Sequence, residues 1–290
     1  MMGEKLAFQK KNGQKIAGKA YFAGTDKKYP TVIFAHGFGS NYRDLEHHGA
    51  GFAEIGINCI FFDFCGGGLK SLSDGKMTQM TVLTEAEDLT EVISQVQQMK
   101  NVDSDQLFIQ GESQGGFVGA YVAAQIPEKI KGLILWYPAF VIPDDAKRRF
   151  EENDNTCFGQ QLSPDYNKVA KDIDIFNVIA GYKGPVVIIH GESDNCVPIS
   201  YSEEAEKVYD NAKLIRIPKA GHGFDGKDSQ FAREQSIEFI RKNWKSNFNK
   251  SRKSPPTTSI AKSNKQWVGT SLYQEGYKPL LINCEAVIWL

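Results

Sequence analysis

The sequence predicts an α/β fold: a mostly parallel central sheet with helices on both faces and an antiparallel hairpin at its N-terminus. Short, uninterrupted apolar runs alternate with longer segments, several of which have helical periodicity. Such runs indicate strands that are buried on both faces, which is typical of parallel sheets covered by helices. The beginning of the chain differs, because its two apolar segments flank Asn12-Gly13, a common hairpin turn.

The elements can be assigned in chain order. The hairpin is expected from residues 6–8 and 16–22. The expected parallel strands are residues 31–35, 58–62, 106–110, 132–136, 186–189 and 214–217. The expected helices are residues 84–99, 114–126, 203–209 and 232–244. Residues 140–182 form a charged segment that is too long for a simple connection, so we expect a short lid insertion there.

Length and composition predict one large domain, residues 1–246, followed by a tail. The chain has 290 residues, of which 41% are hydrophobic and 24% charged, as in ordinary globular proteins. Residues 247–290 are basic and rich in Pro, Ser and Thr, and we expect them to be a solvated tail outside the catalytic fold. A basic docking segment is the alternative for this tail.

Charge and cysteine usage exclude several classes of protein. The net charge of −1 gives no reason to expect a nucleic-acid or membrane partner. The five cysteines are scattered without a C-x-x-C pair, so we expect neither a metal site nor a disulfide framework. Residues 1–14 lack the apolar core of a secretory signal, and we expect a cytoplasmic protein. A homodimer is compatible with these features.

The clearest chemical motif is Gly-Glu-Ser-Gln-Gly at residues 111–115, between an expected strand and an expected helix. The flanking glycines permit a sharp, strained turn that exposes Ser113, as in a nucleophile elbow. A serine hydroxyl needs a base to become a good nucleophile, and that base needs a carboxylate partner. Asp194 and His222 each follow a later strand, so we predict that they complete a catalytic triad with Ser113.

Other residues compete for these roles. Glu192 is a rival acid because it lies closer to the preceding strand, and Asp225 could reach His222 from the C-terminal side. His36 and His190 are more typical of structural histidines that satisfy hydrogen bonds than of catalysts.

An ester-cleaving site also needs two N–H groups that bind the developing oxyanion. The backbone N–H of Gln114 directly follows the nucleophile at the positive end of its helix. The second donor is expected from the loop after the strand at residues 31–35, where Phe38 stands between two glycines. We therefore predict an oxyanion hole formed by Phe38 and Gln114.

Taken together, these motifs resemble the serine-hydrolase branch of the α/β-hydrolase superfamily over roughly residues 4–245. The resemblance rests on residues 36–39, Asp63 with the glycines after it, residues 111–116, residues 190–194 with 197–198, and residues 221–224. Within the superfamily the chain resembles small bacterial esterases that include cinnamoyl and feruloyl esterases, although Glu112 stands where those enzymes usually have His. The resemblance implies an α/β-hydrolase fold and a cofactor-independent carboxylesterase that forms an acyl-enzyme.

The expected partner is a small-molecule ester with a small or aromatic acyl group, hydroxycinnamoyl esters included. Trp136, Tyr137 and Phe140, together with the lid, are expected to shape an apolar acyl pocket. The resemblance also suggests that Asp145 and Tyr166 take the place of lid residues that bind a phenolic hydroxyl.

Two other functions stay open. A serine peptidase would use the same triad, and acidic lid residues could grip a peptide amine; these are Asp144, Asp145, Glu151 and Glu152. A non-catalytic hydrolase-like binding protein is the second alternative, and the complete set of triad residues argues against it.

Overall fold

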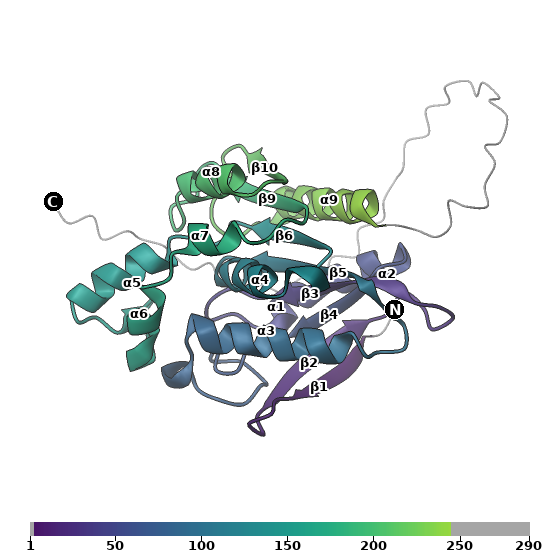
Figure 1. The fold of residues 1–290 in the computed structure, drawn as a ribbon, viewed down its shortest axis with the longest axis horizontal. Coiled ribbons are helices and arrows are strands. Elements are labelled where there is room, and N and C mark those ends of the chain that lie inside the picture. The colour runs from purple at the N-terminus through teal and green to yellow at the C-terminus, as the bar shows by residue number, and fades with distance from the viewer. Residues whose placement is uncertain (1–2, 245–290) are drawn as a thin grey trace.

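The computed structural model describes residues 3–244, so the predicted tail at residues 247–290 lies outside the described part of the chain. An eight-stranded sheet forms the centre of the fold, in the order β1-β2-β4-β3-β5-β6-β9-β10 (Figure 1). Its strands are β1 (Glu4–Gln9), β2 (Lys15–Tyr21), β3 (Tyr29–Ala35), β4 (Asn58–Phe62), β5 (Val102–Glu112), β6 (Gly132–Trp136), β9 (Val186–Gly191) and β10 (Ala212–Ile217).

Strand directions agree with the sequence prediction. β1 and β2 form an antiparallel hairpin, and β2 is also antiparallel to β4. All the other neighbouring strands of the sheet run parallel. Every residue of β4, β6 and β9 is buried, as expected for strands covered on both faces. This is the predicted α/β-hydrolase arrangement, with a mostly parallel sheet and an N-terminal hairpin.

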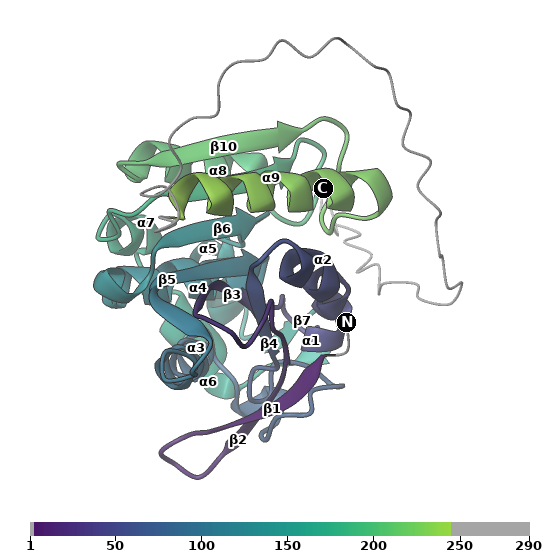
Figure 2. The ribbon, with the colours of Figure 1, turned by 90° about the vertical axis from the view of Figure 1, so that its right-hand side faces the viewer.

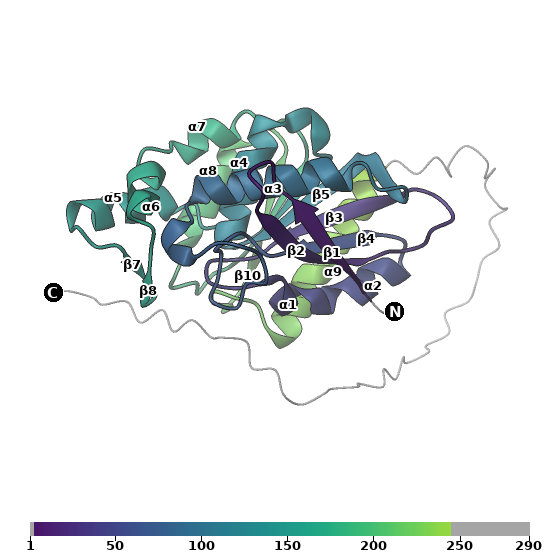
Figure 3. The same cartoon turned by 90° about the horizontal axis from the view of Figure 1, so that it is seen from below.

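Helices cover both faces of the sheet (Figures 2 and 3). One face carries α1 (Tyr42–Leu45), α2 (Gly49–Glu54) and α9 (Gly226–Asn243). The other face carries α3 (Val82–Val96), α4 (Gln114–Gln125), α7 (Ile175–Ile179) and α8 (Ile199–Val208). Short 3-10 helices occur at Glu46–His48, Met77–Gln79 and Pro127–Lys129. A separate apolar cluster fills the space between the sheet and each helical layer.

Helix α3 begins and ends earlier than its apolar periodicity predicts. Thr81 and Thr84 form a reciprocal capping box, in which each side-chain oxygen accepts a hydrogen bond from the other residue's N–H. This pairing satisfies two of the N–H groups that the first turn of a helix leaves without a partner. The start of α3 is therefore set by its cap, two residues before the predicted start at residue 84.

The segment predicted as a lid, residues 140–182, connects β6 to β9 and contains its own small elements. They are α5 (Ile142–Glu151), the hairpin β7 (Thr156–Cys157) and β8 (Gln160–Gln161), α6 (Pro164–Ala170), and then α7. Helices α5, α6 and the hairpin lie together at one end of the molecule (Figure 3). A buried hydrogen bond from Arg149 Nε to Asn167 Oδ1, 3.0 Å long, joins α5 to α6. Within residues 3–244, no helix is both long and apolar enough to cross a membrane.

Candidate active site

Ser113 lies on the sharp turn between β5 and α4. Its backbone has φ +51° and ψ −119°, a conformation that is unfavourable for a residue with a side chain. The glycines on either side are required by close packing. A Cβ on Gly111 would lie 2.3 Å from the carbonyl oxygen of Gly115, and a Cβ on Gly115 would lie 2.3 Å from that of Ala35. The turn therefore presents the Ser113 hydroxyl at the carboxyl edge of the sheet.

The three residues predicted as a triad are hydrogen-bonded in series. The distance from Ser113 Oγ to His222 Nε2 is 2.9 Å, and the distance from His222 Nδ1 to Asp194 Oδ2 is 2.8 Å. Because an ionised carboxylate only accepts hydrogen bonds, His222 donates through Nδ1 and leaves Nε2 to accept from the serine hydroxyl. This tautomer is the one that a general base acting on Ser113 requires.

The rival acids lie elsewhere. Glu192 is exposed, and Asp225 occupies the N-cap position of α9. In the described part of the chain, the carboxylate bonded to His222 Nδ1 is that of Asp194. The carboxylate that the sequence predicted, that of Asp194, is therefore the one that lies beside the histidine.

Asp194 is held in its ionised form by several donors. Its Oδ1 accepts hydrogen bonds from the main-chain N–H groups of Cys196 and Val197, at 2.9 and 2.8 Å. Its Oδ2 lies 3.1 Å from Nε2 of His190. Burial opposes ionisation, but the hydrogen bonds from His190, His222 and Val197 outweigh it and hold the pKa of Asp194 well below its ordinary value of 3.8.

His190 is a structural histidine, as expected, but it also touches the acid of the site. It is fully buried, and its Nδ1 lies 2.7 Å from Ser202 Oγ. Its Nε2 faces two acceptors, Asp194 Oδ2 and the carbonyl oxygen of Val197, which is 3.0 Å away. Nε2 therefore carries a proton and donates to them, and Nδ1 can accept from the Ser202 hydroxyl. The position of His190 at the end of β9, four residues before Asp194, was the sequence signal for this contact.

The two predicted oxyanion donors flank Ser113. A Cβ on Gly37 would lie 3.2 Å from Ser113 Cβ, so the loop that carries Phe38 passes directly beside the nucleophile. His36 helps to hold this loop, because its Nε2 accepts a 3.1 Å hydrogen bond from the N–H of Phe64. Within residues 3–244, neither the Phe38 N–H nor the Gln114 N–H donates to another protein group. Both N–H groups therefore meet one requirement of the predicted oxyanion hole, which is to have no protein acceptor within these residues.

The side chain of Gln114 connects the lid to the nucleophile elbow. Its Oε1 accepts a 2.5 Å hydrogen bond from the Tyr166 hydroxyl of α6, and its Nε2 donates to Glu85 Oε2 at 2.8 Å. Glu85 is buried on α3, and burial raises the pKa of its carboxyl well above the ordinary value. The sequence analysis missed Glu85; the available signal was a carboxylate among the apolar residues that face the core from an amphipathic helix.

The other predicted pocket residues are dispersed. Trp136 is 1% exposed, donates its indole N–H to Ser236 Oγ on α9 at 3.0 Å, and belongs to the apolar cluster on the face away from the lid. The structure therefore does not bring Trp136 together with the lid, contrary to the expectation. Phe140 is buried between Phe117 and Phe176, so it packs inside the lid base and does not face an open pocket.

Tyr137 and Asp145 have different surroundings. The Tyr137 ring lies beside the His222 ring, with centroids 4.8 Å apart, and belongs to the cluster away from the lid. Asp145 is half-buried on α5, where its carboxylate oxygens lie 3.8 Å from Arg148 and 3.9 Å from Arg149.

An aromatic residue at the tip of the lid hairpin was also missed. Phe158 is half-exposed, and its backbone has φ +48°, in the left-handed region that bulky residues rarely adopt. Its ring centroid lies 6.1 Å from that of Phe38. The hairpin therefore places an aromatic ring over the loop that carries one oxyanion donor.

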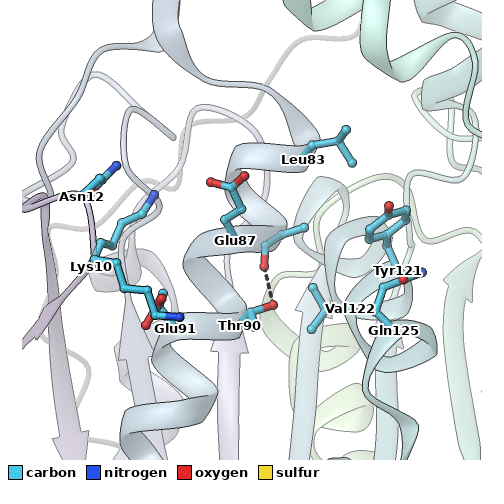
Figure 4. A pocket seen from close by; sticks show the side chains of 11 residues that line it. Lys10, Asn12, Leu83, Glu87, Thr90, Glu91, Tyr121, Val122 and Gln125 are labelled. Carbon is cyan, nitrogen blue, oxygen red and sulfur yellow. Dashed lines mark hydrogen bonds between the residues drawn. The ribbon is translucent and has the colours of Figure 1, made fainter.

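One groove in the described structure lies away from these residues. It has a volume of about 520 Å³ and runs between the β1–β2 turn, α3 and α4 (Figure 4). Its lining residues are Lys10, Lys11, Asn12, Leu83, Ala86, Glu87, Thr90, Glu91, Tyr121, Val122 and Gln125. None of them belongs to the hydrogen-bonded series or to the oxyanion loop, so the candidate site is defined by side-chain geometry rather than by this groove.

One set of side chains has the composition of a metal site. Among the described residues, ligand-type atoms of Asp194, Cys196 and His222 lie within 4.8 Å of one another. Two hydrogen bonds to Asp194 account for this proximity, one from the His222 ring and one from the main-chain N–H of Cys196. Asp194 and His222 are already engaged in the hydrogen-bonded series that ends at the Ser113 hydroxyl.

The chain matches a known protein family and a curated relative. The family model described as "Serine aminopeptidase, S33" matches residues 26–173, which is half of the chain. The uncharacterized protein YfhR of Escherichia coli O157:H7 is 27% identical over 248 residues, which cover 82% of this chain and 80% of that protein.

Solved structures agree with the fold. Est1E from Butyrivibrio proteoclasticus, determined with ferulic acid bound, is 27% identical with a TM-score of 0.74, and the match covers 81% of this chain and 98% of that one. Acetyl xylan esterase 1 from Thermoanaerobacterium sp. JW/SL YS485 is 22% identical with a TM-score of 0.61, covering 81% and 83% of the two chains, and supports the fold alone.

Proposed function

We propose that this chain, which belongs to the serine aminopeptidase S33 family of α/β hydrolases, is a serine carboxylesterase that acts through an acyl-enzyme. The observation that carries this proposal is the series Ser113–His222–Asp194, with hydrogen bonds of 2.9 and 2.8 Å. A hydroxyl, an imidazole and a carboxylate in contact are the parts that nucleophilic catalysis of acyl transfer needs.

In the proposed reaction, Ser113 Oγ forms a bond to the ester carbonyl carbon while His222 Nε2 takes the hydroxyl proton. Asp194 stabilises the imidazolium through Nδ1, and the N–H groups of Phe38 and Gln114 bind the oxyanion. Collapse of the tetrahedral intermediate breaks the bond to the alcohol, which leaves with the proton from His222. Water then attacks the acyl-enzyme, with His222 again as base, and releases the carboxylic acid and the free Ser113 hydroxyl.

For the substrate, we propose esters of small or aromatic acids, hydroxycinnamoyl esters included. The structure of Est1E with ferulic acid supports this class by similarity. The Phe38–Phe158 pair adds support, because aromatic side chains next to the oxyanion loop favour an aromatic acyl or alcohol group. Of the two residues proposed for a phenolic hydroxyl, Tyr166 is already bonded to Gln114, whereas the half-buried Asp145 has only long ion pairs and can accept a hydrogen bond.

The peptidase alternative is favoured by the family description but not by the lid. Asp144 accepts a 2.5 Å hydrogen bond from the Tyr201 hydroxyl, and Glu152 pairs with Arg148 at 2.9 Å. Two of the four acidic lid residues are thus occupied by groups of the protein, so a peptide amine would have to displace those groups or bind Asp145 or Glu151. The lid therefore offers fewer free carboxylates for a peptide amine than the sequence suggested, which supports esters over peptides.

A substrate panel tests the proposal. The wild type and Ser113→Ala are compared on p-nitrophenyl acetate, methyl ferulate and aminoacyl p-nitroanilides. We expect the wild type to hydrolyse the esters and Ser113→Ala to lose about 10³-fold or more in kcat, with an unchanged melting temperature. Faster cleavage of the anilides would favour the peptidase, and an unchanged rate in Ser113→Ala would overturn the proposed nucleophile.

A further inference from the structure

Glu112, the residue before the nucleophile, is paired with Tyr137 at the end of β6. The Tyr137 hydroxyl donates a 2.8 Å hydrogen bond to Glu112 Oε2. Burial is the main reason why the pKa of Tyr137 lies well above its ordinary value of 10.0, so this hydroxyl keeps its proton and donates throughout the neutral range. Tyr137 also has φ +36°, an unfavourable backbone conformation that is maintained beside the candidate site.

The Tyr137 ring lies between two aromatic side chains from the loop after β10. Its centroid is 4.8 Å from that of His222, with the planes inclined at 59°, and 4.7 Å from that of Phe224, in an edge-on contact of 84°. Only 4% of Tyr137 is exposed, so the ring cannot move far without opening this packing.

His222 has few other restraints. Within residues 3–244 its main chain makes no hydrogen bond, and the following Gly223 has φ +82°. The imidazole is held by its bonds to Asp194 and Ser113 at opposite ring nitrogens. The covalent bond to Cβ is the third anchor of the ring, so its orientation depends on the two side-chain torsions of His222 as well as on these bonds. A packed neighbour restricts those torsions and so helps to fix the plane of the ring.

We propose that Tyr137, held in place by Glu112, is a positioning residue that fixes the plane of the His222 ring for proton transfer from Ser113. This inference rests on the proposed function, because it assumes that His222 acts as the base. It also accounts for Glu112, which stands where the esterases that the sequence resembles usually have His. A carboxylate at this position can accept the hydrogen bond from the tyrosine.

The test uses the rate at which a fluorophosphonate labels Ser113, which requires the serine and its base but no particular ester. Glu112→Met removes the acceptor, Tyr137→Phe removes the donor, and the double variant removes both. Glu112→Gln keeps an amide oxygen that can accept from Tyr137. The matched control is Tyr209→Phe, because the Tyr209 hydroxyl is also buried but has no hydrogen-bond partner among residues 3–244. Melting temperatures are measured for every variant.

Because small displacements of a catalytic group can cost up to about 100-fold, we expect Glu112→Met and Tyr137→Phe each to label about tenfold more slowly. The double variant should be no slower than the slower single variant, since both changes break the same contact. Glu112→Gln and Tyr209→Phe should label within about twofold of the wild type. A loss of thermal stability without a loss of labelling would show a merely structural role and overturn the inference.

Two further outcomes would contradict the inference that Tyr137 positions His222. Labelling of Glu112→Met and Tyr137→Phe at the wild-type rate would show that the pair does not position His222. An equal loss in Glu112→Gln and Glu112→Met would show that the charge acts instead of the hydrogen bond. Failure of the proposed function would look different from failure of this inference. A wild-type protein that does not react with the fluorophosphonate lacks the active serine. A wild-type protein that reacts but cleaves no ester has another substrate.

Discussion

Replacing Tyr166 by Phe tests whether the lid supports the oxyanion hole. The substitution removes one hydroxyl, which donates a 2.5 Å hydrogen bond to Gln114 Oε1. Both side chains are buried, so the amide oxygen would be left without a donor and out of reach of bulk water. Leaving a buried acceptor without a donor costs about 1–3 kcal/mol of folding free energy. Tyr166→Phe should therefore lower the free energy of unfolding by about that amount.

Part of this cost should appear in the rate, because the N–H of Gln114 is one of the two proposed oxyanion donors. If the full 1–3 kcal/mol were lost from the transition state, the rate would fall by about 5-fold to 150-fold, at about 1.4 kcal/mol for each factor of ten. Because Glu85 still holds the other end of the amide at 2.8 Å, we expect a fall in kcat of about tenfold.

Tyr182→Phe is the matched control. Its hydroxyl is also buried and donates to the carbonyl oxygen of Ile130 at 3.0 Å, near the starts of β6 and β9 and so at the end of the sheet away from Ser113. Urea unfolding and ester hydrolysis are measured for both variants. Both should be destabilised to a similar extent, and only Tyr166→Phe should lose kcat. A wild-type kcat in Tyr166→Phe, or an equal fall in both variants, would refute the reasoning.

Three other predictions follow from the local environments. Burial, reinforced by Asp44 and opposed by the Tyr137 hydroxyl, raises the pKa of Glu112 from 4.5 to about 7. The folded protein then binds this proton more tightly than the unfolded chain, so stability should fall by about 1–3 kcal/mol from pH 4.5 to 7, and urea titrations should show no such fall in Glu112→Gln. His190→Leu removes a donor to Asp194, whose pKa is lowered by folding. At pH 7 the variant should have a free energy of unfolding about 1–3 kcal/mol lower than that of the wild type. This difference between the two proteins should narrow below pH 3.8, because the stabilisation is lost as Asp194 becomes protonated. Phe158→Asn should stabilise the lid turn by about 0.5–1 kcal/mol, because Asn tolerates a positive φ, and should lower kcat/KM severalfold for aromatic acyl esters but not for acetate.

The sequence predicted the convergence of Ser113, Asp194 and His222 because each follows a strand of a parallel sheet. The carboxyl ends of parallel strands meet at one edge, so residues that are far apart in the chain arrive together there. The same reasoning placed Phe38 beside Ser113, as the close approach of Gly37 shows. For these residues, the order of the strands was sufficient to predict which side chains lie together.

The network around Gln114 could not be predicted in this way. Its contacts to Glu85 and Tyr166 span 29 and 52 residues and depend on how α3 and the lid pack, which no local pattern specifies. The expectation that Trp136 and Tyr137 would lie beside the lid failed for a related reason, because both belong to the apolar cluster on the face away from it. Tyr137 follows the last residue of β6 and has φ +36°, which interrupts the alternation of side chains along the strand, and no sequence pattern indicated this. Helices α1 and α2 were missed because four and six residues are too few to show helical periodicity.

Acid-quenched peptide mapping tests the central claim, a covalent ester on Ser113, most directly. The protein is mixed with p-nitrophenyl cinnamate, quenched within the first turnovers and digested for mass spectrometry. We expect the mass of one cinnamoyl group on the peptide that contains Ser113, and none on that peptide from Ser113→Ala. Turnover of the ester with an unmodified Ser113 peptide, or with the acyl group on another residue, would contradict the mechanism.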